Sequence, residues 1–407
     1  MHHARISLYA MMLAAAGIPL YIHLPRFASV NLGIGLGALG TILLLIRLVD
    51  LVQDPLIGWS IDRWPAAQLG FALTAAAGLA VGFPLLFTST PDTGAITLIL
   101  ILVLLFSAYS LGSILLYGRS ATLASSSDKK GLLNVAGFRE GGMLIGVILA
   151  TMAPAALASL GTARDGYPAF GVLMAAACIV VAAMTVPMWR RPVKDSAPIS
   201  LGALRQAGAM QLLGIALANS LPVAITATLF VFFVEDRLQL PGYAGPLLLL
   251  FFISAGASVP VWTRVAQRLS GRRTLLIAMP LAIVGFSWAA VLSQGDLWPF
   301  VIVCIVSGIA TGADLVVLPA MFSIALTEQG LNASAAFGFW SFAGKLGLAL
   351  AAFLVLPFID QAGFVPGGEN DAAALTRLTL SYAILPCVLK VIAFAMVWTL
   401  PEKETHQ

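Results

Sequence analysis

Apolar residues run along this chain in long blocks separated by short polar segments. Each block has about twenty residues, the length that an α-helix needs to cross a hydrocarbon core of about 30 Å. The pattern predicts helices over residues 7–26, 33–57, 68–88, 95–118, 133–157 and 168–188, and then over 208–233, 243–268, 273–293, 298–326, 333–358 and 374–400. The chain is therefore predicted to be an all-α membrane protein, with twelve transmembrane helices in two six-helix bundles.

The longest polar interval between predicted helices is WRRPVKDSAPISLGALRQAG, which covers residues 189–208. It falls after the sixth helix, where a connection between two helical bundles is expected. We predict an N-terminal six-helix bundle over residues 1–188, a cytoplasmic linker over 189–207 and a C-terminal six-helix bundle over 208–407.

Basic residues gather in the loops on one side of the predicted membrane. The loop GWSIDR at 58–63 and the segment TRVAQRLSGRR at 263–273 each follow the second helix of their half, and the linker carries Arg190 and Arg191. An excess of lysine and arginine marks cytoplasmic loops. Both termini are therefore predicted to be cytoplasmic, in a multi-pass protein of a bacterial inner (plasma) membrane.

The segment TILLLIRLVDLVQDPLIGWSIDR, residues 41–63, carries charges inside an otherwise membrane-spanning stretch. Arg47, Asp50 and Asp54 are three and four residues apart and share one helical face. A charge at the bilayer centre costs about 2.5–3.5 kcal/mol on insertion scales, so the cluster must face protein, water or a bound cation. Two carboxylates one turn apart repel unless a proton, a monovalent cation or Arg47 lies beside them. The cluster predicts a cation-coupled carrier, and a static salt-bridge network is the alternative.

Composition narrows the function classes. Hydrophobic residues make up 60% of the 407 residues and charged residues only 10%, against about 25% charged in soluble domains. The sequence has no G-x-S-x-G, phosphate-cradling loop or H-E-x-x-H motif, and its histidines and three cysteines lack metal-ligand spacing. We expect no enzyme activity, no nucleic-acid partner and no cofactor beyond a coupling ion.

Other charges also fall in or beside the predicted helices. Asp62 and Arg63 lie at the inner membrane edge, where a charge network that stabilises a gate is expected. Asp314 lies in the glycine-rich stretch GIATGADLVVLPA, as a partner for Lys345 or a group facing the solute, and these alternatives stay open. The remaining candidates are Arg119, Arg139, Glu140 and Lys390, of which Lys390 is expected to snorkel or to pair.

With these motifs, the chain resembles the glycoside–pentoside–hexuronide:cation symporter branch of the major facilitator superfamily, whose best-known member is the melibiose permease. The signature of that branch is matched by Arg47, Asp50, Asp54, Pro55, Gly58 and Asp62. Two further stretches support it: GKLGLALAAFLVLPFIDQAGFVPG puts Lys345 on the membrane-embedded lysine of the family, and FREGGMLIG puts Arg139 on the arginine of the fifth helix. The resemblance implies the major facilitator fold.

The resemblance also implies a cation site. In that branch the two aspartates hold Na⁺, Li⁺ or H⁺, a role that falls here to Asp50 and Asp54. An asparagine before the second aspartate and a threonine in the fourth helix complete the family site, and those positions are Gln53 and Ser110 here. Both keep an oxygen ligand, so the coupling ion is expected to be H⁺ or Na⁺, with no metal site beyond a Na⁺ at the two aspartates.

The solute site departs further from the family. Its sugar carriers use a carboxylate in the first helix and another in the fourth, but the first helix here has no acid and the fourth-helix position is Ser113. The aromatic residue one turn later is kept as Tyr117, where a sugar could stack. The resemblance thus implies a solute cavity lined by Tyr117, Ser113 and three cations, Arg119, Arg139 and Lys345.

Three functions follow as hypotheses. The first is symport of a sugar-like or anionic organic solute with a cation, by alternating access between the two bundles. The second keeps the fold but carries lysophospholipids or another amphipathic solute, and the third is a membrane sensor that transports nothing. The expected partners are a small-molecule solute and the lipid bilayer, and the protein is expected to be a monomer.

Overall fold

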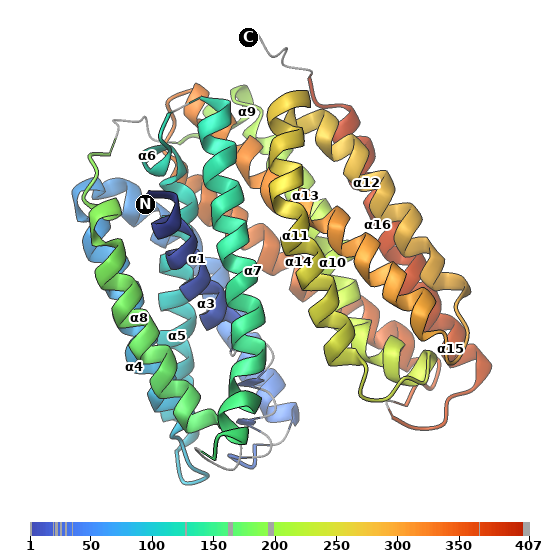
Figure 1. Cartoon of the computed structure of the whole chain (residues 1–407). Coiled ribbons are helices and arrows are strands. Elements are labelled where there is room, and N and C mark those ends of the chain that lie inside the picture. The colour runs from blue at the N-terminus through green and yellow to red at the C-terminus, as the bar shows by residue number, and fades with distance from the viewer. Residues whose placement is uncertain are drawn as a thin grey trace. The chain divides into compact units, whose positions relative to one another are not determined.

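The computed structural model describes residues 2–18, 20, 23–24, 27–28, 31–34, 36–126, 128–161, 166–193, 199–365 and 367–401. These residues are overwhelmingly helical (Figure 1). Contacts divide the chain into two compact units, which are considered separately: the first contains Met1–Ala203 and Leu326–Phe342, and the second contains Leu204–Ala325 and Ala343–Gln407.

The first unit is built from long helices joined by short turns. They are α1 (His2–Ile18), α3 (Leu36–Arg63), α4 (Gln68–Phe87), α5 (Ala95–Gly118), α6 (Ser120–Leu123), α7 (Lys129–Ser159) and α8 (Tyr167–Trp189), with a 3₁₀ turn, η2, at Pro65–Ala67. Helix α1 packs along α7, and α4 packs between α5 and α8 (Figure 1). The rings of Tyr9 and Trp189 meet edge to face at 5.0 Å in the core of this unit.

Small residues allow α1 and α7 to approach closely. A Cβ atom added at Gly142 of α7 would collide with the backbone of Ser7 in α1. The Ser7 hydroxyl also donates a hydrogen bond of 2.7 Å to the Phe138 carbonyl of α7. Close backbone contact through glycine and a serine hydroxyl is typical of helix packing in membranes, where apolar side chains gain little from leaving lipid.

The second unit repeats the pattern of long helices. They are α10 (Ala209–Phe232), α11 (Ala244–Leu269), α12 (Gly271–Ser287), α13 (Leu297–Glu328), α14 (Ala333–Asp360), α15 (Ala372–Thr379) and α16 (Leu385–Trp398), with short segments α9 (Leu201–Gln206), η3 (Phe233–Arg237), η4 (Trp288–Val291) and η5 (Leu380–Ile384). Helix α9 straddles the boundary between the units, and α14 begins in the first unit and continues into the second. The π-helical segments η3 and η5 meet through Phe233 and Tyr382, whose rings stack at 4.1 Å.

Each predicted helix corresponds to an observed one, with α15, η5 and α16 together forming the twelfth. Among the described residues, ten helices are long and apolar enough to cross a membrane. The all-helical prediction is therefore confirmed. The predicted division into 1–188, 189–207 and 208–407 stays a prediction, since residues 194–198 of the linker lie outside the described residues.

Several helices extend beyond their predicted ends. Helix α3 continues to Arg63 rather than ending at residue 57, and α7 begins at Lys129 rather than at residue 133. Hydropathy marks the part of a helix that suits hydrocarbon, whereas backbone hydrogen bonds and caps fix its ends. At α7 the cap is Asp128, whose carboxylate accepts a hydrogen bond of 2.9 Å from the Gly131 amide.

Candidate functional site

Helix α3 turns an apolar face outward and an acidic face inward. Leu48, Val52 and Leu56 are each more than half exposed, whereas Asp50 and Asp54 are both 0% exposed. This is the reverse of a water-soluble surface helix, and it suits a helix whose outer face meets lipid. The two carboxylates therefore lie inside the protein, on one face of α3.

A side-chain bridge joins the first carboxylate to α5. The Gln53 amide donates a hydrogen bond of 3.1 Å to Oδ1 of Asp50. The Ser107 hydroxyl of α5 in turn donates one of 2.9 Å to Oε1 of Gln53. Ser110, predicted as a cation ligand, is buried one turn after Ser107. Ser107 was not predicted, although its position one turn before Ser110 on the same helix is a signal that could have found it.

The second carboxylate is held by α14, within the part of that helix that belongs to the first unit. The Ser341 hydroxyl donates a hydrogen bond of 2.6 Å to Oδ2 of Asp54. The helices touch closely there, since a Cβ atom at Gly338 would lie 2.6 Å from the Asp54 carbonyl oxygen. Sequence reasoning missed Ser341, and the only signal for it is its position one turn before the predicted lysine, Lys345.

The groups around the two aspartates are hard oxygen donors. They comprise the carboxylates of Asp50 and Asp54, the amide oxygen of Gln53 and the hydroxyl of Ser341, a set that suits a proton or a small hard cation rather than a soft metal. Within the described ranges, no group of three or more His, Cys, Asp or Glu side chains could hold a metal ion. The side chain of Arg47 lies outside the described part of the chain, so its expected pairing with Asp50 stays a prediction.

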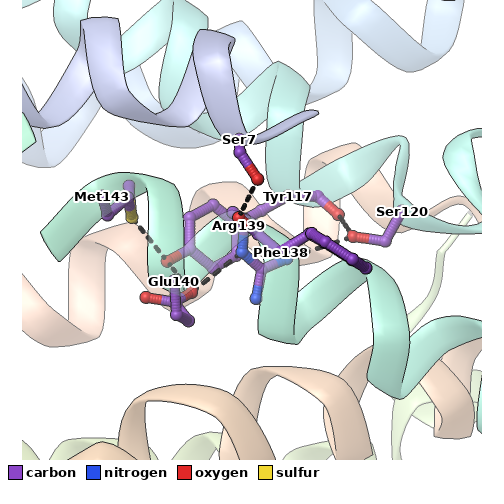
Figure 2. A network of polar contacts seen from close by, with 7 residues as sticks. All are labelled: Ser7, Tyr117, Ser120, Phe138, Arg139, Glu140 and Met143. Carbon is purple, nitrogen blue, oxygen red and sulfur yellow. Dashed lines mark hydrogen bonds and ion pairs between the residues drawn. The ribbon is translucent and has the colours of Figure 1, made fainter. Parts of the chain in front are cut away.

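A second polar cluster connects α5 and α7. The Tyr117 hydroxyl donates a hydrogen bond of 2.8 Å to Oε1 of Glu140, and Nε of Arg139 donates to the same oxygen at 2.9 Å (Figure 2). The Arg139 guanidinium lies over the Tyr117 ring, 3.6 Å from its centroid. Its Nη1 donates to the Ser120 hydroxyl at 3.3 Å, and that hydroxyl donates to the Tyr117 carbonyl at 2.7 Å. Arg139 and Glu140 are both buried.

This cluster changes the expected solute site in two ways. Glu140 enters it as a carboxylate, although the sequence had marked it only as a buried charge. One face of Tyr117 is covered by Arg139, so a sugar could stack on that face only if the guanidinium moved. Nη2 of Arg139 is buried and has no hydrogen-bond partner among the described residues, and the same holds for Oγ of Ser113, one turn before Tyr117 on α5.

A third network surrounds the end of α3. The Asp62 carboxylate accepts hydrogen bonds from the backbone amides of Ala335, at 2.7 Å, and Ser334, at 3.3 Å, so it caps the start of α14. A negative charge at a helix N-terminus is favourable because it meets the positive end of the helix dipole. Nη1 of Arg119 lies 3.7 Å from Asp62, and Nη2 of Arg119 donates to the Ile61 carbonyl at 2.7 Å.

Arg119 lies in this network, and its expected role in binding a solute stays a prediction. It was expected among the solute-binding cations, but its hydrogen bonds and its charge partner belong to the network of Asp62. The reason is its location at the end of α5, beside the end of α3, a contact that depends on helix packing rather than on local sequence. Arg63, the last residue of α3, is exposed.

The remaining predicted charges lie in the second unit. Asp314 forms a buried ion pair with Lys390, whereas a pair with Lys345 was one of the two alternatives left open by the sequence. The ammonium of Lys390 also donates to the side-chain oxygen of Asn219. Lys345 is buried on α14, and its role in binding a solute stays a prediction.

Buried carboxylates and arginines inside membrane-length helices are typical of functional sites in membrane proteins. A sequence profile described as MFS/sugar transport protein matches residues 6–403. The chain therefore belongs to this family of the major facilitator superfamily, which makes it a multi-pass membrane transporter that handles small-molecule solutes rather than an enzyme.

Solved structures show the same fold at low sequence identity. The chain is similar to a bacterial homologue of the iron transporter ferroportin in an outward-facing state, with 15% identity, 98% of this chain and 99% of that one covered, and a TM-score of 0.69. It is also similar to FucP, a major facilitator superfamily transporter in the outward conformation, with 12% identity, coverage of 96% and 98%, and a TM-score of 0.69. A second structure of FucP, the E. coli fucose:proton symporter, gives a TM-score of 0.62 at 12% identity, with the same coverage. No curated protein matches the chain in sequence. These similarities establish the major facilitator fold.

Proposed function

We propose that this protein is a secondary active transporter of the melibiose permease-like branch, which couples the movement of a small polar solute to H⁺ or Na⁺ by alternating access. The observation that carries the proposal is the pair of fully buried carboxylates, Asp50 and Asp54, on a helix whose opposite face is apolar. Two acids buried one turn apart repel each other unless a proton, a monovalent cation or Arg47 lies beside them, and a coupling ion fits this place.

The hydrogen bonds of these carboxylates suggest how ion binding reaches other helices. A cation at the pair needs lone pairs from the same oxygens that now accept hydrogen bonds, so the Ser341 and Gln53 side chains would have to turn as it binds. Gln53 is linked to α5 through Ser107, and Ser341 lies on α14. Occupation of the site would therefore shift the balance between two arrangements of α5 and α14 against α3, and ion binding and solute binding would be linked reciprocally.

The second cluster supports a solute that carries hydroxyl groups, a negative charge or both. Glu140 supplies a carboxylate that could accept hydrogen bonds from hydroxyl groups, in place of the acids that the family has in its first and fourth helices. Nη2 of Arg139 is a buried donor in need of an acceptor, and a carboxylate oxygen of the solute would be the strongest one. A sugar acid or a similar hydroxylated anion fits both groups, and we propose this class as the solute.

Lysophospholipids are the second candidate, because a buried arginine could also receive a phosphate head group. A lysophospholipid carries a phosphate and a free glycerol hydroxyl at one end and a long apolar tail at the other, so its polar end could use both Arg139 and Glu140. Uptake measurements separate the two classes of solute.

The same proposal includes the membrane location and orientation of the protein. The concentration of basic residues in alternate loops supports an orientation with both termini in the cytoplasm. We propose the bacterial inner membrane as its location and a monomer as its functional state.

Uptake by purified protein in vesicles tests the function. Labelled sugars, sugar acids and lysophospholipids are offered with and without an imposed Na⁺ or H⁺ gradient, and gradient-driven uptake of a sugar acid is expected. Asp50→Asn and Asp54→Asn should abolish gradient dependence, while Asp371→Asn, which keeps a helix cap far from the site in sequence, should transport normally. Uptake that ignores both gradients would refute symport, and uptake of lysophospholipids alone would refute the proposed solute.

A further inference from the structure

A buried ion pair lies inside the second unit, away in sequence from every residue that the proposed function uses. Lys390 of α16 pairs with Oδ2 of Asp314 in α13 and donates a hydrogen bond of 2.5 Å to Oδ1 of Asn219 in α10. Each of the three residues is less than one-tenth exposed. Three helices of the unit thus bring one acid, one base and one amide to a single point.

Structural stabilisation alone is a weak reason for such a pair. Removing two charges from water costs several kcal/mol for each ion, and well-packed apolar residues often do as well or better in the same place. In a membrane protein, an ionisable residue within a spanning helix is by default a candidate for function. The pair is therefore better explained by a role in which the ionisation state of Asp314 or Lys390 changes.

The two partners are not equally satisfied. The ammonium of Lys390 has two acceptors, Asp314 and Asn219. Oδ1 of Asp314 is buried and has no hydrogen-bond partner within the described ranges. A buried carboxylate oxygen without a donor is costly, and this oxygen is the one to which a proton would add without first breaking the contact with Lys390.

A cavity borders the Lys390 side of the pair. It has a volume of about 80 Å³, and Lys390 lies in its wall together with Ser307 and Thr311 of α13 and Cys387 of α16. The two hydroxyls donate to backbone carbonyls of their own helix, so their oxygens remain able to accept hydrogen bonds. The wall is otherwise mostly apolar, and its few polar groups beside Lys390 could hold a water molecule there.

The groups that face the pair are largely uncharged. Helix α11 meets α13 through Ser258 and Trp262, which donate to the Ile309 carbonyl, and α12 contributes Ala278 to the same contact. Besides Lys390, α16 contributes the Cys387 thiol to the cavity wall.

One further charge lies on a helix that touches α10. Helix α14 meets α10 where Gly347 faces Ser220, the neighbour of Asn219, and it carries the buried Lys345 two residues earlier. Among the buried residues described in this unit, Asp314 is the acid, and Lys345 and Lys390 are the bases.

We propose that Asp314 and Lys390 form a proton-exchange site in the second unit, separate from the carboxylates of α3. A proton from water on the Lys390 side of the pair binds Oδ1 of Asp314 and turns the carboxylate into a neutral carboxyl group. Lys390 keeps its own proton and its hydrogen bond to Asn219. The unit gains one positive charge in this step and loses it when the proton returns to water, so proton binding would favour an anionic solute and proton release would disfavour it.

Infrared difference spectra of the purified full chain, recorded between neutral and acidic pH, test this site. We expect the carbonyl band of a protonated carboxyl group in the wild type, its loss in Asp314→Asn and its retention in Asp314→Glu. The band should survive in Asp50→Asn and Asp54→Asn, which separates this site from the α3 carboxylates. Asp371→Asn is the matched control, since the same change at an exposed helix cap should leave the buried carboxyl band unaltered.

The infrared spectrum of Lys390→Met provides an independent test in which Asp314 is kept. Without its counter-charge, Asp314 should be protonated at neutral pH as well, so the band should lose its pH dependence. A folded Asp314→Asn variant with the wild-type spectrum would overturn the proposal. If Asp314→Asn does not fold, a Lys390→Met spectrum identical to that of the wild type would overturn it equally.

Discussion

The hydroxyl of Ser341 in α14 donates a hydrogen bond of 2.6 Å to the Asp54 carboxylate in α3. This contact links the proposed cation site to a helix that begins in one structural unit and continues into the other. A cation that binds Asp54 would compete with the Ser341 hydroxyl for Oδ2 of the carboxylate. Substitution of Ser341 therefore tests whether cation binding is coupled to α14.

We expect Ser341→Ala to strengthen cation binding by about 10-fold, because the cation no longer competes with a hydrogen bond to a charged group, which contributes about 1.5–3 kcal/mol. Calorimetric titration of the purified protein with Na⁺ and Li⁺, and of proton uptake when pH is lowered, measures the change. Ser287→Ala is the matched control, since its hydroxyl bonds only to the Val284 carbonyl of its own helix. Equal cation affinities in the wild type and in Ser341→Ala would show that α14 takes no part in the site.

Glu140→Gln tests the cluster on α5 and α7. The amide still accepts a hydrogen bond from Tyr117, but Arg139 loses its charge partner in a buried place. We expect the free energy of unfolding to fall by about 3 kcal/mol, the usual cost of breaking a buried pair by removing one partner. Denaturant unfolding in detergent measures it. Glu235→Gln, at an exposed position of η3, should change stability little, and an equal effect of both variants would contradict the assigned pairing.

Asp62→Ala should loosen the start of α14. The carboxylate caps that helix at Ser334 and Ala335, and loss of a helix cap costs about 1 kcal/mol, which is about five-fold in local opening. Hydrogen–deuterium exchange read by mass spectrometry should show faster exchange at the first turn of α14. Asp371→Ala removes a comparable cap from α15 and should accelerate exchange there only. Unchanged exchange at α14 would mean that Asp62 does not hold the helix end.

The cap of α7 predicts a pH dependence. The Ser126 hydroxyl and then the Gly131 amide hold the pKa of Asp128 below its ordinary value. A carboxyl group with a lowered folded-state pKa stabilises the protein above its unfolded pKa, about 3.9 for aspartate, and this contribution is lost as the pH falls through the folded value. Asp128→Ala should therefore lower the thermal midpoint at neutral pH, and the difference should shrink below about pH 4. A difference that stays constant down to low pH would contradict the charged cap.

The local pattern of apolar and charged residues was sufficient to predict the helices and the burial of the acidic face of α3. The predicted helix over 95–118 coincides with α5, because a run of apolar residues has one low-energy arrangement in a bilayer. The burial of Asp50 and Asp54 likewise follows from spacing, since residues three and four apart share a face and charges avoid lipid. Helix ends were less predictable because they depend on caps such as Asp128, which hydropathy ignores.

The partners of the buried charges were decided by tertiary structure. Asp54 and Ser341 are 287 residues apart, and nothing in either local sequence indicates that a glycine, Gly338, lets the two helices touch. Asp314 pairs with Lys390 and Arg119 with Asp62 for the same reason. An ion pair forms only where helix packing brings two charged groups within about 4 Å, because only there is their attraction strong enough to offset the loss of hydration. The sequence determined that charges would be buried, and the packing of the helices determined which charge each one meets.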